Sequence, residues 1–467
     1  MKKTAFPTTP AGRLKLFFTF FDSRWEDLTK ENWKITVYRD FSAGLIVAMT
    51  AIPMAMGFAI AMGMRPEHGI IAGALACVVG RTFGGSKYQV YGPTAAFIPV
   101  IAALIFKYGP ANGGNFEDAH GFLILVSMIS GVILIIAGFY GAGKYAKLVP
   151  NSIIVGFTIG IAVAIALTNF KDILGLQTFS KLFGSESGIF NKISHALSNL
   201  SIINPWAILI GVMTFVITKG LLKISIFIPG PVIAMTTATV LASTLLADKN
   251  IILVKDLYGS IPNNFFVFTA PHLPNVTLSV IIDIIYFVGA IVFVSGVESI
   301  LCSSMADKLA ENKNTPFNPD KEFFGQGMVQ IITPLIQGFP CTGALARTAT
   351  SIKAGARTPL AGYFKAVLKL TMAYYLAQYL ELIPMACIGG ILVWVASNMI
   401  KPAEIREIKH LGKFEFSMML YTAVMVPMTD FLTGVLSALI IYFVVKKFFS
   451  KKKDETKEQE LELSEVI

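Results

Sequence analysis

Charged side chains are scarce in this sequence. Asp, Glu, Lys and Arg make up 15% of its 467 residues, whereas soluble domains carry about 25%. Hydrophobic residues make up 54%, and the mean hydropathy is +0.65. A soluble protein needs a polar outer shell, which this composition cannot supply. The composition therefore excludes a soluble enzyme, a disordered chain and a DNA-binding domain.

Residues that build metal sites, disulfides and catalytic groups are also few. The five histidines have no ligand spacing, and all four cysteines fall in apolar stretches, namely Cys77, Cys302, Cys341 and Cys387. We therefore expect buried free thiols, no metal site and no cofactor. No nucleophile–base arrangement and no phosphate loop of the G-x-x-x-x-G-K-[ST] type is present, so we expect no enzymatic activity. The net charge of +10 fits basic cytoplasmic loops better than it fits a nucleic-acid partner.

Long hydrophobic runs are what the sequence does contain. They are continuous rather than alternating, which predicts membrane-spanning helices in a lipid bilayer and excludes a β-barrel. The candidate segments are 42–63, 68–85, 91–106, 121–140, 148–168, 203–218, 225–247, 278–303, 325–338, 340–353, 359–380, 382–398, 414–429 and 431–448. Two of them, Pro93 to Phe106 and Pro340 to Lys353, are too short to cross, because about 14 helical residues cover about 21 Å.

Basic residues are distributed unevenly between the two sides of this map. With the N-terminus inside, roughly 29 of the 39 Lys and Arg fall in cytoplasmic segments and roughly 7 fall outside. The remainder, Arg347, Lys365 and Lys369, lie inside spans. We therefore predict a multi-pass protein of the inner (plasma) membrane with both termini in the cytoplasm.

The two halves of the chain resemble each other weakly. Val149-Pro150 precedes Gly156 by the same spacing with which Ile383-Pro384 precedes Gly390, and both open apolar spans. The two short segments are the third and the tenth, seven spans apart. Because seven is odd, the second half must be inverted relative to the first, which is the plan of many secondary transporters.

Each short segment begins with glycine, proline and small residues that let a ligand approach the backbone. The first begins Tyr91-Gly92-Pro93-Thr94-Ala95-Ala96, and the second begins Gly338-Phe339-Pro340-Cys341-Thr342-Gly343-Ala344. A helix that starts at mid-membrane has about four unbonded N–H groups and about half a positive charge. Two such starts facing one point would bind an anion. The alternative is that both are ordinary proline-kinked spans.

Two charged residues, Arg347 and Glu298, lie inside the predicted spans, where a charge is energetically unfavourable. Arg347 could add positive potential to the anion site or could snorkel from the cytoplasmic end of a short helix. Glu298 has no Lys or Arg within nine residues on either side. A carboxyl in a dry span suits proton uptake and release. A hydrogen-bonded structural carboxyl and an ion pair with Arg347 are the alternatives for Glu298.

The short sequence motifs of the chain resemble those of the SulP family of anion transporters. The markers run in order over residues 35–448: Asp40-Phe41-Ser42-Ala43-Gly44-Leu45, Ile52-Pro53, Phe83-Gly84-Gly85-Ser86, Gln89-Val90-Tyr91-Gly92-Pro93-Thr94, Glu298-Ser299, Ala306-Asp307, Gly325-Gln326-Gly327, residues 338–348 and residues 355–362. Their order and spacing together carry the resemblance.

The resemblance implies an all-α polytopic membrane protein, a seven-plus-seven inverted repeat with core and gate domains and two half-helices that meet at mid-membrane. Its parts would be a cytosolic segment 1–40, repeats 41–247 and 278–448, and a short charged tail 449–467. The resemblance also implies an anion site, a coupling residue and shaping prolines. The site would comprise Thr94, Gly343, Ala344, Leu345, Ala346 and Arg347, with Glu298 coupling transport to a cation and with Pro53, Pro93 and Pro340 shaping it.

Two departures from the family pattern affect the expected function. Relatives that look like sodium-driven bicarbonate carriers have Asp with Thr four residues on, whereas this chain has Glu298 and Cys302; since a thiol is a poor sodium ligand, we expect protons. The usual cytosolic STAS domain does not fit in the tail, which leaves open whether the protein forms a homodimer.

We expect a secondary active, proton-coupled symporter of small inorganic anions, of the sulfate or bicarbonate class, working by alternating access. The alternatives are a carrier of dicarboxylates or nucleobases, a sodium-coupled bicarbonate carrier and a passive anion channel.

Overall fold

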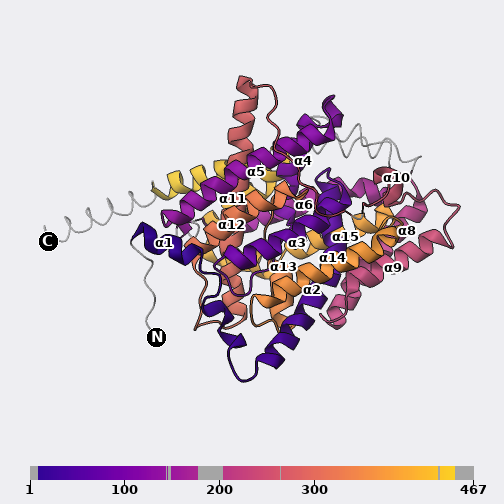
Figure 1. Cartoon of the computed structure of the whole chain (residues 1–467). Coiled ribbons are helices and arrows are strands. Elements are labelled where there is room, and N and C mark those ends of the chain that lie inside the picture. The colour runs from indigo at the N-terminus through magenta and orange to yellow at the C-terminus, as the bar shows by residue number, and fades with distance from the viewer. Residues whose placement is uncertain are drawn as a thin grey trace, which may run out of the picture.

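The computed structural model describes residues 9–143, 145, 149–176, 203–262, 264–429 and 432–447, and Figure 1 shows the chain as a bundle of helices. The helices of the first half are α1 (Pro10–Phe17), α2 (Trp33–Ala61), α3 (Pro66–Phe83), α4 (Ile98–Tyr108), α5 (Phe116–Phe139), α6 (Asn151–Leu174), α8 (Pro205–Ile224) and α9 (Gly230–Ser243). Those of the second half are α10 (Val254–Tyr258), α11 (Leu278–Leu309), α12 (Pro319–Leu335), α13 (Leu345–Lys353), α14 (Leu360–Leu380), α15 (Met385–Met399), α16 (Pro402–Leu411) and α17 (Lys413–Met428). Residues 432–447 are also helical, and β1 (Tyr91–Gly92) and β2 (Thr342–Gly343) are extended.

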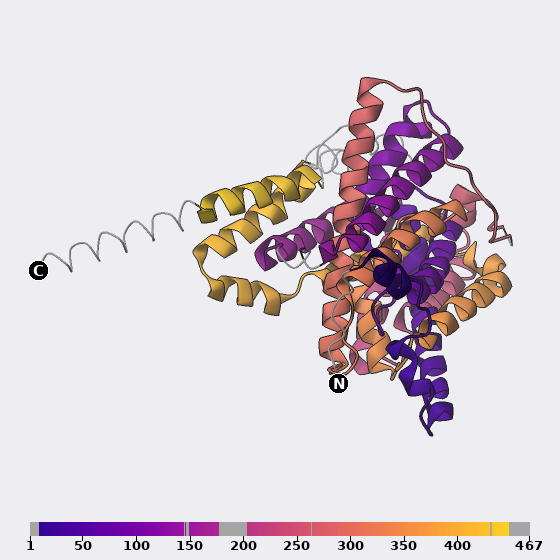
Figure 2. The ribbon, with the colours of Figure 1, turned by 60° about the vertical axis from the view of Figure 1, so that its left-hand side comes forward.

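Every predicted apolar segment coincides with a helix. In the described part of the chain, six helices have at least 18 residues and the hydropathy needed to cross a membrane. The longest, α11, covers about 48 Å and runs through the height of the molecule in Figure 2. The fold is therefore the expected all-α polytopic one.

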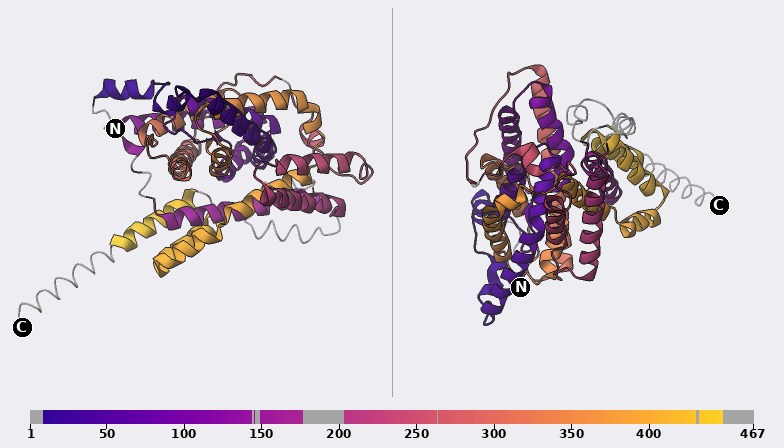
Figure 3. Two further views of the ribbon diagram at one scale, coloured as in Figure 1. Left: turned by 90° about the horizontal axis from the view of Figure 1, so that it is seen from below. Right: turned by 90° about the vertical axis from the view of Figure 1, so that its right-hand side faces the viewer.

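The helices form two layers. One layer holds α2–α5 and α11–α14, and the other holds α6, α8, α9, α15, α17 and residues 432–447; Figure 3 (left) shows α6, α17 and the last helix side by side, apart from the first layer. The apolar stretch of α2 is 89% buried, whereas that of α8 is 28% buried. Exposed apolar side chains on α8, such as Leu209, Val212 and Val216, give it a lipid-facing surface.

The contacts between helices are related as an inverted repeat requires. α6 packs along α17, and α15 packs along α8. α2 packs along α14, and α11 packs along α5. In each case, replacing both helices of the first pair by the helices seven spans away along the chain gives the second pair. These contacts support the expected repeat.

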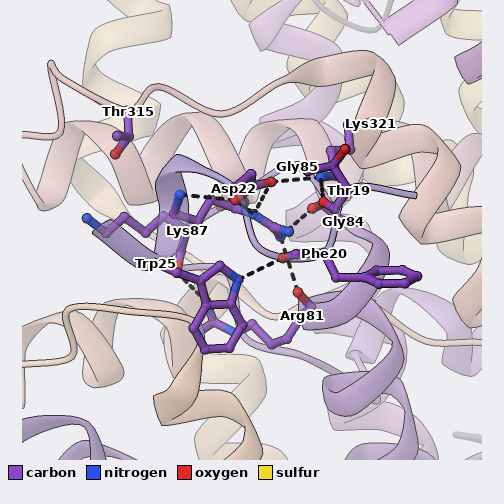
Figure 4. Close-up of polar contacts among 12 residues, drawn as sticks. Thr19, Phe20, Asp22, Trp25, Arg81, Gly84, Gly85, Lys87, Thr315 and Lys321 are labelled. Carbon is purple, nitrogen blue, oxygen red and sulfur yellow. Dashed lines mark hydrogen bonds and ion pairs between the residues drawn. The ribbon is translucent and has the colours of Figure 1, made fainter. Parts of the chain in front are cut away.

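The N-terminal segment contacts the ends of α3 and α12 (Figure 4) and, through Arg13, the end of α5. Asp22 bridges Arg24 (2.8 Å) and Lys321 (2.7 Å). Arg24 is 3% exposed and also donates to the carbonyls of Arg81 and Gly84 at the end of α3. Two elements distant in sequence are thus joined through one carboxylate.

Asp22→Asn should therefore destabilise the protein. Burial raises the pKa of Asp22, but Arg24 and Lys321 outweigh it and hold the pKa below its usual value. The ionised carboxylate thus stabilises the fold fully above the usual pKa of an aspartate, and this stabilisation is lost as pH falls through the lowered value. We expect a loss of about 2–3 kcal/mol at neutral pH, below that of a fully buried pair because the Asp22 side chain is 21% exposed.

Heating detergent-solubilised protein and measuring the folded fraction by gel filtration checks this expectation. Glu26→Gln removes an exposed acidic group of the same segment that forms no ion pair within the described residues, so it is the control. Equal melting temperatures for the two variants would contradict the role of Asp22.

The predicted topology can be tested at two exposed asparagines. Asn112→Cys, in the turn after α4, should react with a membrane-impermeant maleimide in intact cells, whereas Asn314→Cys, in the α11–α12 connection, should react only after lysis. The four native cysteines are buried and provide a silent background. Labelling of both variants in intact cells would contradict the map.

Candidate functional site

The two short segments meet at a small antiparallel pair of strands. Tyr91 pairs with Gly343, and Gly92 pairs with Thr342. All four residues are buried in the first helix layer. The pair brings together the parts of the two halves in which the sequence predicts an anion site.

Helical structure begins later than the sequence analysis predicts. Helical turns start at Ala95 and Leu345, whereas Pro93 and Pro340 lie in extended chain before them. The prolines therefore do not form the first helical turns: Pro93 directly follows β1, and the residues of β2 separate Pro340 from α13. Ala344 is the N-cap of α13 and supplies no side-chain cap, so no side chain of the N-cap occupies the first N–H groups of α13.

One helix, α12, holds both strands. The side-chain amide of Gln330 donates to the carbonyl of Cys341, just before β2, at 2.8 Å, and that of Gln326 donates to the same carbonyl. Glu322 accepts bonds from the hydroxyl of Tyr91 in β1 (2.7 Å) and from the amide of Gln89 (2.8 Å).

Glu322 is a site residue that the sequence does not predict. It lies before the predicted span, where an acidic residue reads as a loop charge. In the structure its carboxylate is fully buried and also accepts bonds from Ser299 of α11 and from the backbone N–H groups of Gly85 and Ser86. Its role is to fix the approach to β1.

Arg347 joins the two half-helices. It is 4% exposed, and its guanidinium donates to the carbonyl of Pro93, which precedes the first half-helix. A second guanidinium nitrogen, Nη1, is buried with no hydrogen-bond partner among the described residues. Snorkelling to the aqueous surface, one of the two sequence-based alternatives, is therefore wrong.

Glu298 of α11 lies against the start of the first half-helix. Its Oε2 accepts a 2.9 Å hydrogen bond from the hydroxyl of Thr94. Within the described residues it forms no ion pair, so the alternative pairing with Arg347 does not occur. The Glu298 side chain is itself partly exposed.

The accessible part of the second half-helix is apolar. Ala346 is exposed and Leu345 is partly exposed, whereas Gly343, Ala344 and Arg347 are buried. A Cβ on Gly343 would lie 2.5 Å from the Gln89 side chain, so only glycine fits there. The hydroxyl of Thr342 donates to the carbonyl of Ser295 in α11 and not to the accessible surface.

The remaining predicted residues lie deeper. Pro53 is buried inside the continuous helix α2, and beyond it Gly57 lies against Leu392 of α15 in the second layer. Cys302 is fully buried and contacts the hydroxyl of Thr348 (3.3 Å). Glu298 is thus partly exposed and bonded to the buried hydroxyl of Thr94, whereas Cys302 bonds into the α11–α13 contact.

This architecture has known counterparts. Residues 37–422 match the sulfate permease family. YvdB of Bacillus subtilis, named as a candidate sulfate transporter, is 33% identical over 417 residues, which is 89% of this chain and 74% of the relative. The bicarbonate transporter BicA of Picosynechococcus is 28% identical over 366 residues, which is 77% of this chain and 61% of the relative.

Solved structures share the fold. The transmembrane domain of a cyanobacterial bicarbonate transporter, BicA, superposes with a TM-score of 0.72 at 22% identity, covering 86% of this chain and 97% of that chain. The murine anion transporter Slc26a9 in its inward-facing state superposes with a TM-score of 0.79 at 16% identity, covering 96% and 73%.

A negative charge at the α13 N-cap should compete with a bound anion. Ala344→Glu places a carboxylate where the helix dipole favours a negative charge, so this carboxylate should take the position of the anion. We expect anion affinity to fall by about 100-fold. Ala344→Gln has the same size without the charge and is the matched control, and isothermal titration with sulfate or bicarbonate measures both.

Removing the Arg347 charge should weaken the same site. Arg347→Gln is expected to lower anion affinity by about tenfold and to reduce the dependence of binding on ionic strength. Unchanged affinity in both Ala344→Glu and Arg347→Gln would remove this site from consideration.

Proposed function

The chain belongs to the sulfate permease family, and we propose that it is a secondary active transporter of small inorganic anions, of the sulfate or bicarbonate class, that carries its substrate together with a proton. Family membership points to transport rather than to catalysis. We place the protein in the inner (plasma) membrane, with two inverted seven-span repeats and alternating access at the strand pair.

The observation that carries this proposal is the convergence of two helix starts on one strand pair. Each start contributes unbonded N–H groups and about half a positive charge. Arg347 adds a full charge next to them, bonded to the carbonyl before the opposite half-helix. An anion with oxygen atoms would satisfy the N–H groups and offset the charge of a guanidinium held in the membrane interior.

The geometry favours an anion over an organic ring. A nucleobase carrier needs polar side chains that read the edge of the ring, whereas the accessible tip of α13 presents Leu345 and Ala346. The one hydroxyl at this tip, that of Thr342, is bonded to α11. Backbone groups and dipoles recognise charge and size, which suits a compact oxyanion.

Glu298 is the proposed coupling residue. Its hydrogen bond to Thr94 ties its charge state to the start of the first half-helix. An anion at the site lowers the local positive potential and so favours protonation of Glu298. Since linkage is reciprocal, protonation favours anion binding, and the two move together. Sodium is disfavoured because Cys302, with a soft sulfur, is bonded to Thr348.

Glu298→Gln imitates the permanently protonated carboxyl. The variant should bind and exchange the anion but should lose accumulation driven by an inward proton gradient. Uptake of labelled sulfate and bicarbonate into proteoliposomes, with imposed pH or sodium gradients, separates the two activities, and counterflow without a gradient is the control for folded protein.

Unchanged proton-driven accumulation in Glu298→Gln would refute its role in coupling. A strict sodium requirement in the wild type would contradict the argument that Cys302 disfavours sodium as the coupling ion. Absence of uptake for every inorganic anion tested would contradict the proposed function itself.

A further inference from the structure

Two lysines are buried in the middle of α14. Lys365 is 1% exposed and Lys369 is 0% exposed, and they lie one helical turn apart on the face that packs against α3. The site described above uses neither. A buried lysine is rare unless it is paired, so these two need a physical explanation.

Their nitrogen atoms lie beside the strand pair. Lys365 Nζ donates to the carbonyl of Tyr91 at 2.8 Å and to that of Gly73 at 3.1 Å. Lys369 Nζ donates to the carbonyl of Gly69 at 3.2 Å. A Cβ on Gly73 would lie 2.2 Å from Lys369 Nζ and 3.1 Å from Pro93, so the absence of a side chain at Gly73 leaves space for the amine beside Pro93.

Arg347 reaches the same place from the other half-helix. A Cβ on Gly92 would lie 3.1 Å from its Nη1 and 3.4 Å from the Cα of Gly73. This Nη1 is the buried guanidinium nitrogen without a partner in the described residues. Three basic side chains therefore surround the contact between Gly73 and Gly92.

The groups that face these lysines do not neutralise them. They are Cys77 and Arg81 of α3, Cys341 before β2, and Arg347 of α13. The acidic residues of the packed elements are engaged elsewhere. Asp40 of α2 accepts bonds from Arg357 and Thr358, and Glu67 of α3 pairs with Arg65. Glu298 of α11, which acts electrostatically on Arg347, accepts its hydrogen bond from Thr94. In the described part of the chain no carboxylate lies within 4.0 Å of Lys365, Lys369 or Arg347.

We propose that Lys369 is a neutral amine when the site is empty and becomes an ammonium when the anion binds, so that it carries a coupling proton in addition to the one assigned to Glu298. The proposal rests on the proposed anion transport. Three adjacent buried cations, none of them in an ion pair, are unfavourable, whereas one anion beside them offsets the added charge. Lys369 is the residue that changes, because it has one carbonyl acceptor and Lys365 has two.

The step is a simple proton transfer. A proton from water on the side to which the site is open joins the lone pair of Lys369 Nζ, and no bond within the protein breaks. When the site opens to the other side, the anion leaves and the ammonium returns the proton to water. Because the proton and the anion favour each other's binding, the result is symport.

Titration calorimetry of the purified protein with sulfate, in two buffers of different ionisation enthalpy at neutral pH, counts the protons taken up for each anion bound. Wild type should take up protons. Lys369→Met imitates the neutral amine and should bind sulfate at least about tenfold more weakly, with reduced proton uptake. Lys369→Arg keeps a permanent charge and should bind sulfate with proton uptake equally reduced.

Lys219→Met is the matched control, since Lys219 is an exposed lysine of a membrane helix, α8, outside the site. Its affinity and proton uptake should equal those of wild type. Sulfate binding by wild type without proton uptake, or undiminished proton uptake in both Lys369 variants, would overturn the proposal and leave anion transport intact. No binding of sulfate, chloride or bicarbonate by wild type would overturn the proposed function and this proposal together.

Discussion

The structure depends on providing hydrogen-bond partners for the backbone N–H and C=O groups of two non-helical segments inside a membrane. Between Gln89 and Ala95, and between Gly338 and Leu345, neither segment has the internal hydrogen bonds of a helix. The β1–β2 pair supplies some of these bonds, and side chains of α12 supply others. In hydrocarbon each unsatisfied group costs several kcal/mol, so the pairing of the two halves and the protein around it are energetically required.

The sequence predicts the helices well because apolar length is a local property. All fourteen apolar segments, including the two short ones, could be located from it. The starts of the half-helices could not, since the pairing of Tyr91 with Gly343 joins residues that are distant in the sequence. Glycine and proline indicated an interruption, but nothing in either segment alone indicates that extended chain continues to Ala95 and Leu345.

Prediction of the site was limited in the same way. The sequence identifies Arg347 and Glu298 as charges that need an explanation, and the structure gives them the partners Pro93 and Thr94 rather than each other. From the sequence, Lys365 and Lys369 are only charges inside a span, because their importance depends on which face of α14 contacts Gly69 and Gly73 of α3. One positive site emerges that combines two helix dipoles with three basic side chains, and an anion is the natural complement of such a site.

The most direct test of this account is a structure of the protein with bound selenate, a sulfate analogue whose selenium can be located by anomalous scattering. We expect one peak beside the starts of the two half-helices, with its oxygens about 3 Å from the first N–H groups of α13. Selenate found only at other positions, under conditions in which it competes with the transported anion, would contradict the central claim.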